Sequence, residues 1–215
     1  MERPQYYPVF LDLRGKRVVV VGGGAVATGK VRGLLPCGPD PLVVVAPRAS
    51  AYIQEQAAAG RLDWRARPFS ADDLDGAALA FGATDDRALN AAVAAAARQR
   101  GVPVLAVDDV PNCDLIAPAV VKRGDLVIAI STNGRSPALA RWLRERLEAA
   151  LPEHWGELLD VVATARVRLR AAGRRVSPER WQAALDGELE RLVQTGDRAA
   201  ALQLLLARLG PAGAA

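Results

Sequence analysis

The chain contains few of the residues that build disulfide frameworks and metal sites. It has two cysteines and a single histidine among its 215 residues. Cys37 and Cys113 lie far apart in the sequence and neither belongs to a C-x-x-C pair, which argues against a disulfide framework and against a zinc site. His154 stands without a neighbouring Cys or second His, so we interpret it as structural and expect no metal site.

Signals for membrane insertion or secretion are also missing. No uncharged apolar run reaches the roughly 18 residues of a membrane span, and the first residues, M-E-R-P-Q-Y-Y-P, lack the apolar segment of a signal peptide. The cysteine usage suits a reducing compartment. These features predict a soluble cytoplasmic protein that does not bind membranes.

Strong positive charge is absent as well. The formal net charge is +4, with no block of basic residues and no strand in which basic and aromatic residues alternate. This mild bias suits an anionic small molecule better than nucleic acid, so we expect no nucleic-acid partner. Aromatic residues are scarce at 5% and alanine is abundant, which favours close-packed helices against a sheet.

The most informative feature that is present is a glycine loop after four valines. Val18–Val21 has the pattern of a buried parallel strand, and the following G-G-G-A-V-A fits the G-x-G-x-x-G/A motif of dinucleotide-binding folds. In that motif Gly22 permits a tight turn, Gly24 is the second glycine and lets the backbone approach a pyrophosphate, and Ala27 lets the next helix pack closely. The alternative is a glycine-rich turn with no ligand. The valine strand before the motif and the helical pattern after it favour a dinucleotide site.

Strand and helix signals alternate through the first half of the chain, which predicts an α/β fold: a Rossmann-like parallel sheet with helices on both faces. The predicted strands are Val18–Val21, Leu42–Ala46, a more exposed one around Leu62–Ala66, Leu79–Ala83 and Val104–Val107. The predicted helices are Val26–Leu35, one that Ser50 caps and that runs to Ala59, and Arg87–Arg100.

The second half has a different pattern. A loop-rich stretch around the possible strand Ile116–Val121 leads to a clear strand, Leu126–Ser131, and then to a helix that begins at Ser136-Pro137. Beyond Glu153 the sequence predicts only helices, separated by Gly173, Gly187 and Gly196.

Polar groups follow the predicted strands of the first half, where ligands bind in a doubly wound sheet. Asp108 stands at a strand end after largely apolar residues, and partial burial there would suit a general base. A turn or N-cap aspartate is the alternative. Asp85 and Asp86 precede a helix and are more typical of capping residues.

The second predicted strand lacks the acidic residue that usually holds the ribose of NAD. Ala46 and Pro47 occupy that place, so we expect backbone groups around them to hold the ribose. Arg48 follows and has two interpretations. It either binds the 2′-phosphate of NADP or is a solvated arginine after a turn.

These segments together resemble the precorrin-2 dehydrogenase/sirohydrochlorin ferrochelatase family, the N-terminal module of sirohaem synthases. The resemblance is close over about residues 6–156 and looser in the helical tail. The motifs that carry it are, in chain order, Tyr7–Leu11, Gly22–Ala27 with Lys30, Val45–Pro47, Ala83–Asp86, Val107–Asp109, Cys113–Ala119, and Ile128–Pro137 leading into Leu139–Arg141.

The resemblance implies an NAD-binding Rossmann domain over residues 1–113, a dimerisation region over 114–151 and a helical domain over 152–215. It implies a homodimer that removes two electrons from precorrin-2 with NAD to give sirohydrochlorin, with Fe²⁺ as a possible further substrate for chelatase activity. The family's catalytic aspartate falls on Asp108. The expected cofactor contacts are Gly22, Gly23, Gly24, Ala25, Val26, Ala46, Pro47 and Thr84.

The substrate of this family is a tetrapyrrole with several carboxylates, which basic and hydroxyl side chains would hold. The expected substrate-binding residues are Lys122, Ser131, Thr132, Asn133 and Arg135. For Arg135 and Lys122 a solvated surface position is the alternative.

Two departures from the family pattern stand out. Leu105 and Ala106 occupy positions where the family often has Asn, and Asn133 replaces the first glycine of a Ser/Thr-Gly-Gly turn, from which we expect a stiffer loop.

Two other function classes remain open from the sequence. A regulatory NAD-sensing domain would usually keep the missing ribose-binding acid. An unrelated reductase would normally have a Tyr/Lys pair or a catalytic His, which Tyr52 and His154 do not supply.

Overall fold

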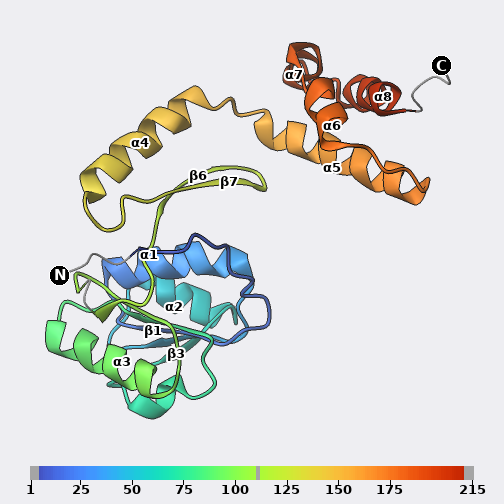
Figure 1. The fold of residues 1–215 in the computed structure, drawn as a ribbon. Helices are drawn as coiled ribbons and strands as arrows, with labels where there is room; N and C mark the ends of the chain where they lie inside the picture. The colour runs from blue at the N-terminus through green and yellow to red at the C-terminus, as the bar shows by residue number, and fades with distance from the viewer. Residues whose placement is uncertain (1–4, 110–111, 211–215) are drawn as a thin grey trace. The chain divides into compact units, whose positions relative to one another are not determined.

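The computed structural model describes residues 5–109 and 112–210 (Figure 1). The chain divides after Ala117 into two compact units. The first is an α/β unit and the second contains a strand hairpin followed by helices. Among the described residues, no helix is both long enough and apolar enough to cross a membrane.

The first unit is built on a five-stranded parallel sheet with the strand order β3-β2-β1-β4-β5. Its central strand holds the four valines of the sequence motif, and all four are buried. The strands are β1 (Val18–Val21), β2 (Leu42–Val45), β3 (Asp63–Arg65), β4 (Leu79–Gly82) and β5 (Val104–Ala106). The predicted strands and the predicted α/β fold are therefore confirmed. Strand β1 has the predicted bounds, and the other four strands are one residue shorter at one end or, for β3, at both ends.

Helices cover both faces of this sheet, which explains why its strands read as continuous apolar runs. Val18 and Val20 point to the face packed against α1 and α2. Val19 and Val21 point to the opposite face, packed against α3. The helical elements of the unit are α1 (Ala25–Leu34), η1 (Leu35–Cys37), α2 (Ala51–Ala58), η2 (Ala71–Leu74) and α3 (Arg87–Gln99) (Figure 1).

The predicted caps fix where two of these helices begin. The Ser50 hydroxyl accepts a hydrogen bond from the backbone N–H of Ile53 at the start of α2. The Asp86 carboxylate accepts from the N–H groups of Ala88 and Leu89 at the start of α3. Asp86 is thus confirmed as a capping residue, whereas Asp85 does not cap this helix, contrary to expectation.

A buried carboxylate joins the end of β3 to η2. Asp73 is 1% exposed and accepts hydrogen bonds from the guanidinium groups of Arg65 and Arg67 and from the backbone N–H of Ser70. Burial by itself would raise the pKa of Asp73, but the hydrogen bonds from Arg67, Ser70 and Arg65 outweigh it and lower the pKa to about 2. The ionised form is therefore the one that the fold stabilises.

The second unit begins with an antiparallel hairpin, β6 (Ala119–Arg123) and β7 (Leu126–Ile130), followed by α4 (Pro137–Ala150). Strand β6 starts three residues later than predicted. Ser136 caps α4 as expected, by accepting from the N–H of Leu139. The buried Arg123 guanidinium donates to the carbonyl oxygens of Glu148 and Leu151. It thus provides donors for carbonyl groups at the C-terminal end of α4 that have no partner within the helix.

The rest of the second unit is helical, as predicted. It contains α5 (Trp155–Ala171), α6 (Pro178–Ala184), α7 (Gly187–Gln194) and α8 (Arg198–Leu209) around a separate apolar core. Gly173 and Gly196 lie between helices with positive φ, as expected, but Gly187 is the first residue of α7 rather than a separator. His154 and Trp155 both contact the Glu190 carboxylate and join α5 to α7, which is the structural role expected of His154.

We predict that Asp73→Asn lowers the free energy of unfolding by about 2–4 kcal/mol at neutral pH, because it removes one partner of a buried ion-paired cluster. A carboxylate whose pKa is lowered on folding stabilises the native state above its unfolded pKa, and that stabilisation is lost as the pH falls. The difference in the free energy of unfolding between wild type and variant should therefore become smaller as the pH falls from about 4 to about 2. Urea titrations over this range measure it, with Asp72→Asn as an exposed control, and a difference that does not change with pH would contradict the account.

Candidate functional site

A cleft of about 1140 Å³ lies in the first unit, at the carboxyl ends of the parallel strands. Val21 pairs with both Val45 and Gly82, so the residues that follow β1, β2 and β4 meet at one edge of the sheet. This is the edge at which open α/β sheets bind ligands. The structure places all of the expected cofactor-binding residues and the expected catalytic residue in the lining of this one cleft: Gly22, Gly23, Gly24, Ala25, Val26, Ala46, Pro47, Thr84 and Asp108.

Gly22 makes the tight turn that the motif predicts. Its φ of +123° is rarely adopted by residues with a side chain, and a Cβ there would collide with the carbonyl oxygen of Ala83. Its N–H donates to the Val45 carbonyl at 3.0 Å, and the Ala83 N–H donates to the Val21 carbonyl at 2.8 Å. The turn is therefore fixed against the ends of both neighbouring strands.

Gly23 occupies the variable position between the two motif glycines and packs against the segment after β2. A Cβ at Gly23 would collide with the carbonyl oxygen of Arg48 and lie 2.9 Å from the Cα of Ala49, and the Ser50 N–H donates to the Gly23 carbonyl at 2.9 Å. Its small size thus lets the loop pack closely against the segment after β2. The motif leaves this position variable, so the spacing of its glycines did not show that a small residue is needed here.

Gly24 is the glycine that faces open space. No heavy atom lies within 4 Å of a Cβ built there, and Gly24 is the N-cap residue of α1. Among the described residues, no side chain caps this helix end. The N–H groups of the first turn have no helical acceptors and carry the positive end of the helix dipole. This end of α1 therefore fits the pyrophosphate of a dinucleotide.

Two hydroxyl groups connect the starts of α1 and α2 beneath the cleft. The Thr28 and Ser50 hydroxyl oxygens lie 2.7 Å apart, and Thr28 also donates to the Gly24 carbonyl at 2.9 Å. Both residues line the cleft. Neither was expected in the site, although Ser50 was identified as a cap and a hydroxyl four residues after the N-cap of α1 was visible in the sequence.

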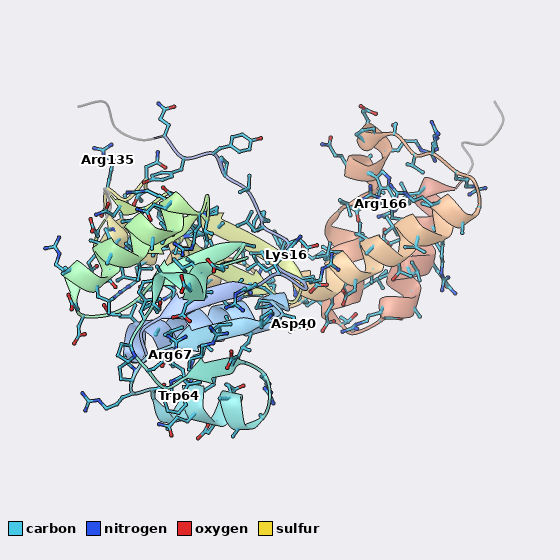
Figure 2. The ribbon with its side chains drawn as sticks, turned by 90° about the horizontal axis from the view of Figure 1, so that it is seen from below. Lys16, Asp40, Trp64, Arg67, Arg135 and Arg166 are labelled. Atoms are coloured by element: carbon cyan, nitrogen blue, oxygen red, sulfur yellow. The ribbon has the colours of Figure 1, made fainter. Side chains whose placement is uncertain are left out.

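The backbone after β2 is already engaged where the ribose was expected to bind. The Ala46 N–H donates to the Arg65 carbonyl at 3.2 Å, and the Ala46 carbonyl accepts from the Trp64 indole N–H at 3.0 Å. Pro47 has no N–H. Trp64, which is marked in Figure 2, therefore fixes this segment in place. Arg48 follows it as an exposed side chain in the cleft lining.

The loop after β4 is held by a buried asparagine that the sequence analysis missed. Asn90 is 1% exposed, accepts hydrogen bonds from the N–H and hydroxyl of Thr84, and donates to the Thr84 carbonyl. The Thr84 hydroxyl also bonds to Asp86. Thr84 thus shapes the cleft wall, with most of its polar groups already used. The sequence offered one signal for this role, because Asn90 is a polar residue among the apolar positions of the alanine-rich helix α3.

Asp108 has an unusual backbone conformation. Its φ of +58° lies in the left-handed region that non-glycine residues adopt infrequently. Such conformations persist where the surrounding structure determines them. Here the Cys113 thiol donates to the carbonyl oxygens of Ala106 and Asp109, and the Asp114 carboxylate accepts from the Val104 N–H at 3.1 Å.

The side chain of Asp108 is exposed in the cleft, so the expected partial burial is not found. Its exposure follows from its place, because the residue comes after the buried part of β5 ends at Ala106. The structure thus presents a carboxylate to a ligand in the cleft.

Lys30, which follows the glycine motif on α1, lies over the ring of Phe81 on β4. Its ammonium group is 5.8 Å from the centre of the Phe81 ring, and burial lowers the pKa of this lysine. It is not part of the cleft lining.

The expected substrate-binding residues all belong to the second unit. Lys122 lies on β6, and the others form the turn between β7 and α4. Asn133 adopts a φ of +52°, which Asn tolerates better than other residues with side chains, so the replacement of glycine fits the turn. The Asn133 N–H bonds to Ser131 and the Ser136 N–H to Thr132, while Arg135 remains exposed (Figure 2). Their assignment to the substrate stays a prediction.

Metal ligands are not grouped in the part of the chain that the structure describes. No cluster of three or more His, Cys, Asp or Glu residues there could hold a metal ion.

Comparison with protein families gives two matches that together cover most of the chain. Residues 9–119 match a family described as putative NAD(P)-binding, and residues 123–150 match one described as sirohaem biosynthesis protein, central region. The first match includes every residue of the cleft lining.

The chain is also similar to individual proteins. It is 42% identical over 203 residues to siroheme synthase of Methylococcus capsulatus, which covers 94% of this chain and 43% of that protein. It is 39% identical over 216 residues to siroheme synthase of Azotobacter vinelandii, covering 98% and 45%. The chain thus spans a little under half the length of these relatives. The solved structure of SirC, a precorrin-2 dehydrogenase, is 28% identical with a TM-score of 0.73 and covers 94% of this chain and 100% of that one.

We predict that Gly23→Ala and Gly24→Ala separate stability from dinucleotide binding. Gly23→Ala should lower the melting temperature strongly, because its Cβ meets backbone that cannot move without displacing the segment after β2. Gly24→Ala should cost at most about 1 kcal/mol, the usual loss of a good N-cap residue, but should weaken NAD binding because its Cβ enters the open side of the cleft. Thermal unfolding and calorimetric titration with NAD measure the two effects. Equal destabilisation by both variants would contradict the roles assigned here.

Proposed function

The chain belongs to the family of NAD(P)-binding sirohaem biosynthesis proteins, and from this premise we propose that it is an NAD-dependent precorrin-2 dehydrogenase that forms sirohydrochlorin. Precorrin-2 would lose one hydride and one proton as its conjugation extends. The proposal requires a dinucleotide site, a group that accepts the proton and a place for a tetrapyrrole. A soluble protein with no membrane partner fits this role.

One observation carries the proposal: the uncapped start of α1 and the Asp108 carboxylate line the same cleft. The first supplies backbone N–H groups for the pyrophosphate. The second supplies an acceptor for a proton at the edge where ligands bind in such sheets. The left-handed conformation of Asp108 supports this role, because such conformations cluster at functional sites.

The residues of the cleft suggest how the reaction would proceed. NAD, when bound, supplies the acceptor for the hydride. The N–H groups at the start of α1 would orient its pyrophosphate, and Val26, which is 49% exposed, would offer apolar surface beside it. The Asp108 carboxylate would take the proton that the macrocycle carbon loses. The segment after β2 contributes no acidic residue to the lining, and the N–H and carbonyl of Ala46 are already hydrogen-bonded. In this segment the Arg48 side chain would therefore contact the adenosine ribose.

The other function classes are less well supported. The similarity to siroheme synthases and to a precorrin-2 dehydrogenase does not favour a regulatory NAD-sensing domain. An unrelated reductase would need a Tyr/Lys pair or a histidine in the cleft. The Tyr52 ring instead lies under the Arg32 guanidinium, 3.9 Å from the ring centre, and His154 contacts Glu190 in the second unit.

The tetrapyrrole substrate belongs to the same proposal, with Arg135, Lys122 and the turn of Ser131, Thr132 and Asn133 as its expected contacts. Insertion of Fe²⁺ to give sirohaem stays a prediction from the resemblance. Adding ferrous ion to sirohydrochlorin in the presence of the protein tests it, and a rate equal to that without protein would contradict it.

We predict that the protein is a homodimer through α4. Leu139 and Trp142 on this helix are 47% and 49% exposed, and the Arg146 guanidinium covers part of the Trp142 ring at 4.4 Å. Large exposed apolar side chains on one helix are typical of an interface. Light scattering at micromolar concentration should give twice the chain mass. A monomeric mass would contradict the prediction.

The activity itself is tested by anaerobic incubation of the protein with precorrin-2 and NAD. The absorption spectrum should change to that of sirohydrochlorin, while NADH should form in about equal amount and be detected by its own absorbance. An unchanged spectrum would refute the dehydrogenase proposal.

Asp108→Asn tests the role of the carboxylate, because Asn tolerates the left-handed backbone as well as Asp does. We expect turnover to fall about 10²–10⁴-fold, the usual contribution of a general base, with NAD affinity nearly unchanged. Asp125→Asn, which removes an exposed carboxylate from the hairpin turn, serves as the control for net charge. Turnover of Asp108→Asn close to that of the control would refute the assignment.

A further inference from the structure

A second groove lies within the helical part of the second unit. It has a volume of about 1010 Å³ and runs between the C-terminal half of α5 and α6. It is separate from the cleft described above, because every residue that lines it lies between Val162 and Leu185. Ligand sites for small molecules commonly have volumes of about 300–1,000 Å³.

Four of the residues that line this groove are arginines, and none of them is acidic. Arg166 and Arg170 lie four residues apart on α5, so their side chains project from the same face of the helix. Arg174 and Arg175 follow in the connection to α6. Arg166 is marked in Figure 2. All four are exposed.

This arrangement is unfavourable for the chain by itself. Like charges four residues apart on a helix destabilise it. The dipole of α5 favours basic residues in its last turn, which explains the presence of both Arg168 and Arg170. Of these two residues, Arg170 lines the groove and Arg168 does not. The dipole does not account for Arg174 and Arg175, which lie beyond the end of the helix. A bound anion would offset the repulsion among these guanidinium groups.

The remaining walls of the groove are apolar. Trp181 is partly buried against the helical core and also lines the groove. Leu185, which is 45% exposed, lies on the same side, and Val176 and Pro178 belong to the connection between the two helices. The groove therefore combines apolar and aromatic side chains with four guanidinium groups in one lining.

A planar macrocycle with carboxylates around its edge has the matching chemistry. Its face is apolar and would pack against Trp181 and Leu185. Its carboxylates would accept paired hydrogen bonds from arginine. We propose that the groove between α5 and α6 is a second binding site for a polycarboxylate tetrapyrrole, separate from the NAD cleft. This proposal rests on the proposed function, and it gives the helical region a role in receiving or retaining the tetrapyrrole.

Binding of uroporphyrin to the full-length chain tests the proposal. Uroporphyrin is a stable polycarboxylate tetrapyrrole that is already fully conjugated, so it binds without being turned over. Its fluorescence should change on titration with wild-type protein, more strongly at low salt. Hydrogen exchange should slow in residues 172–185 when it binds. Absence of protection there would overturn the proposal.

Arg166→Gln/Arg170→Gln should weaken this binding by about tenfold or more, because it removes two charge-assisted contacts. The matched control is Arg168→Gln/Arg191→Gln, which removes the same charge from exposed residues outside the groove. All four side chains are exposed, so circular dichroism should show unchanged folding. Equal affinity of the two double variants would overturn the proposal, because net charge alone would then explain the binding.

Two further results separate this proposal from others. A single-stranded oligonucleotide that displaces uroporphyrin at equal concentration would overturn it in favour of a nucleic-acid site. Turnover of precorrin-2 by the wild-type protein is measured in parallel. Turnover without binding in the groove refutes the second site alone, and binding in the groove without turnover refutes the proposed enzyme alone.

Discussion

The contact of the glycine loop with the ends of two neighbouring strands determines the rest of the first unit's chemistry. Gly22 lies against the Ala83 carbonyl and Gly23 against that of Arg48, at distances that no side chain would allow. Through these contacts the loop after β1 touches the segments after β4 and β2. The cleft forms where the segments after β1, β2 and β4 meet, and they can come this close because Gly22 and Gly23 have no Cβ atoms. Only Gly24 faces open space, and it begins the helix that would bind the pyrophosphate.

Neutral hydrogen bonds, more than charges, hold the walls of this cleft in position. Trp64 fixes the segment after β2, and Asn90 fixes the loop after β4. The ionisable groups of the lining, including Arg48 and Asp108, are left exposed at the surface of the cleft. The frame of the cleft is thus held by backbone and neutral side chains, while Arg48 and Asp108 stay accessible to a ligand.

The fold was largely predictable from the sequence, because it depends on local patterns. Four consecutive valines, the glycine motif and the caps at Ser50 and Asp86 each carry their own signal. The residues that shape the site depend on distant contacts and were not predictable in the same way. Trp64 reaches Ala46 from 18 residues away, and the true neighbour of Gly23 is Arg48. Nothing in the sequence showed that Asp108 would take a left-handed conformation, or that four arginines would line one groove.

We expect the start of α1 and Asp108 to face the same dinucleotide when it binds. A crystal structure of the protein grown with NAD would test this arrangement. The account predicts the pyrophosphate within hydrogen-bond distance of the N–H groups of Ala25 and Val26, about 2.7–3.2 Å, with the nicotinamide directed toward Asp108. A dinucleotide bound elsewhere, or one bound at α1 with its nicotinamide directed away from Asp108, would contradict the account.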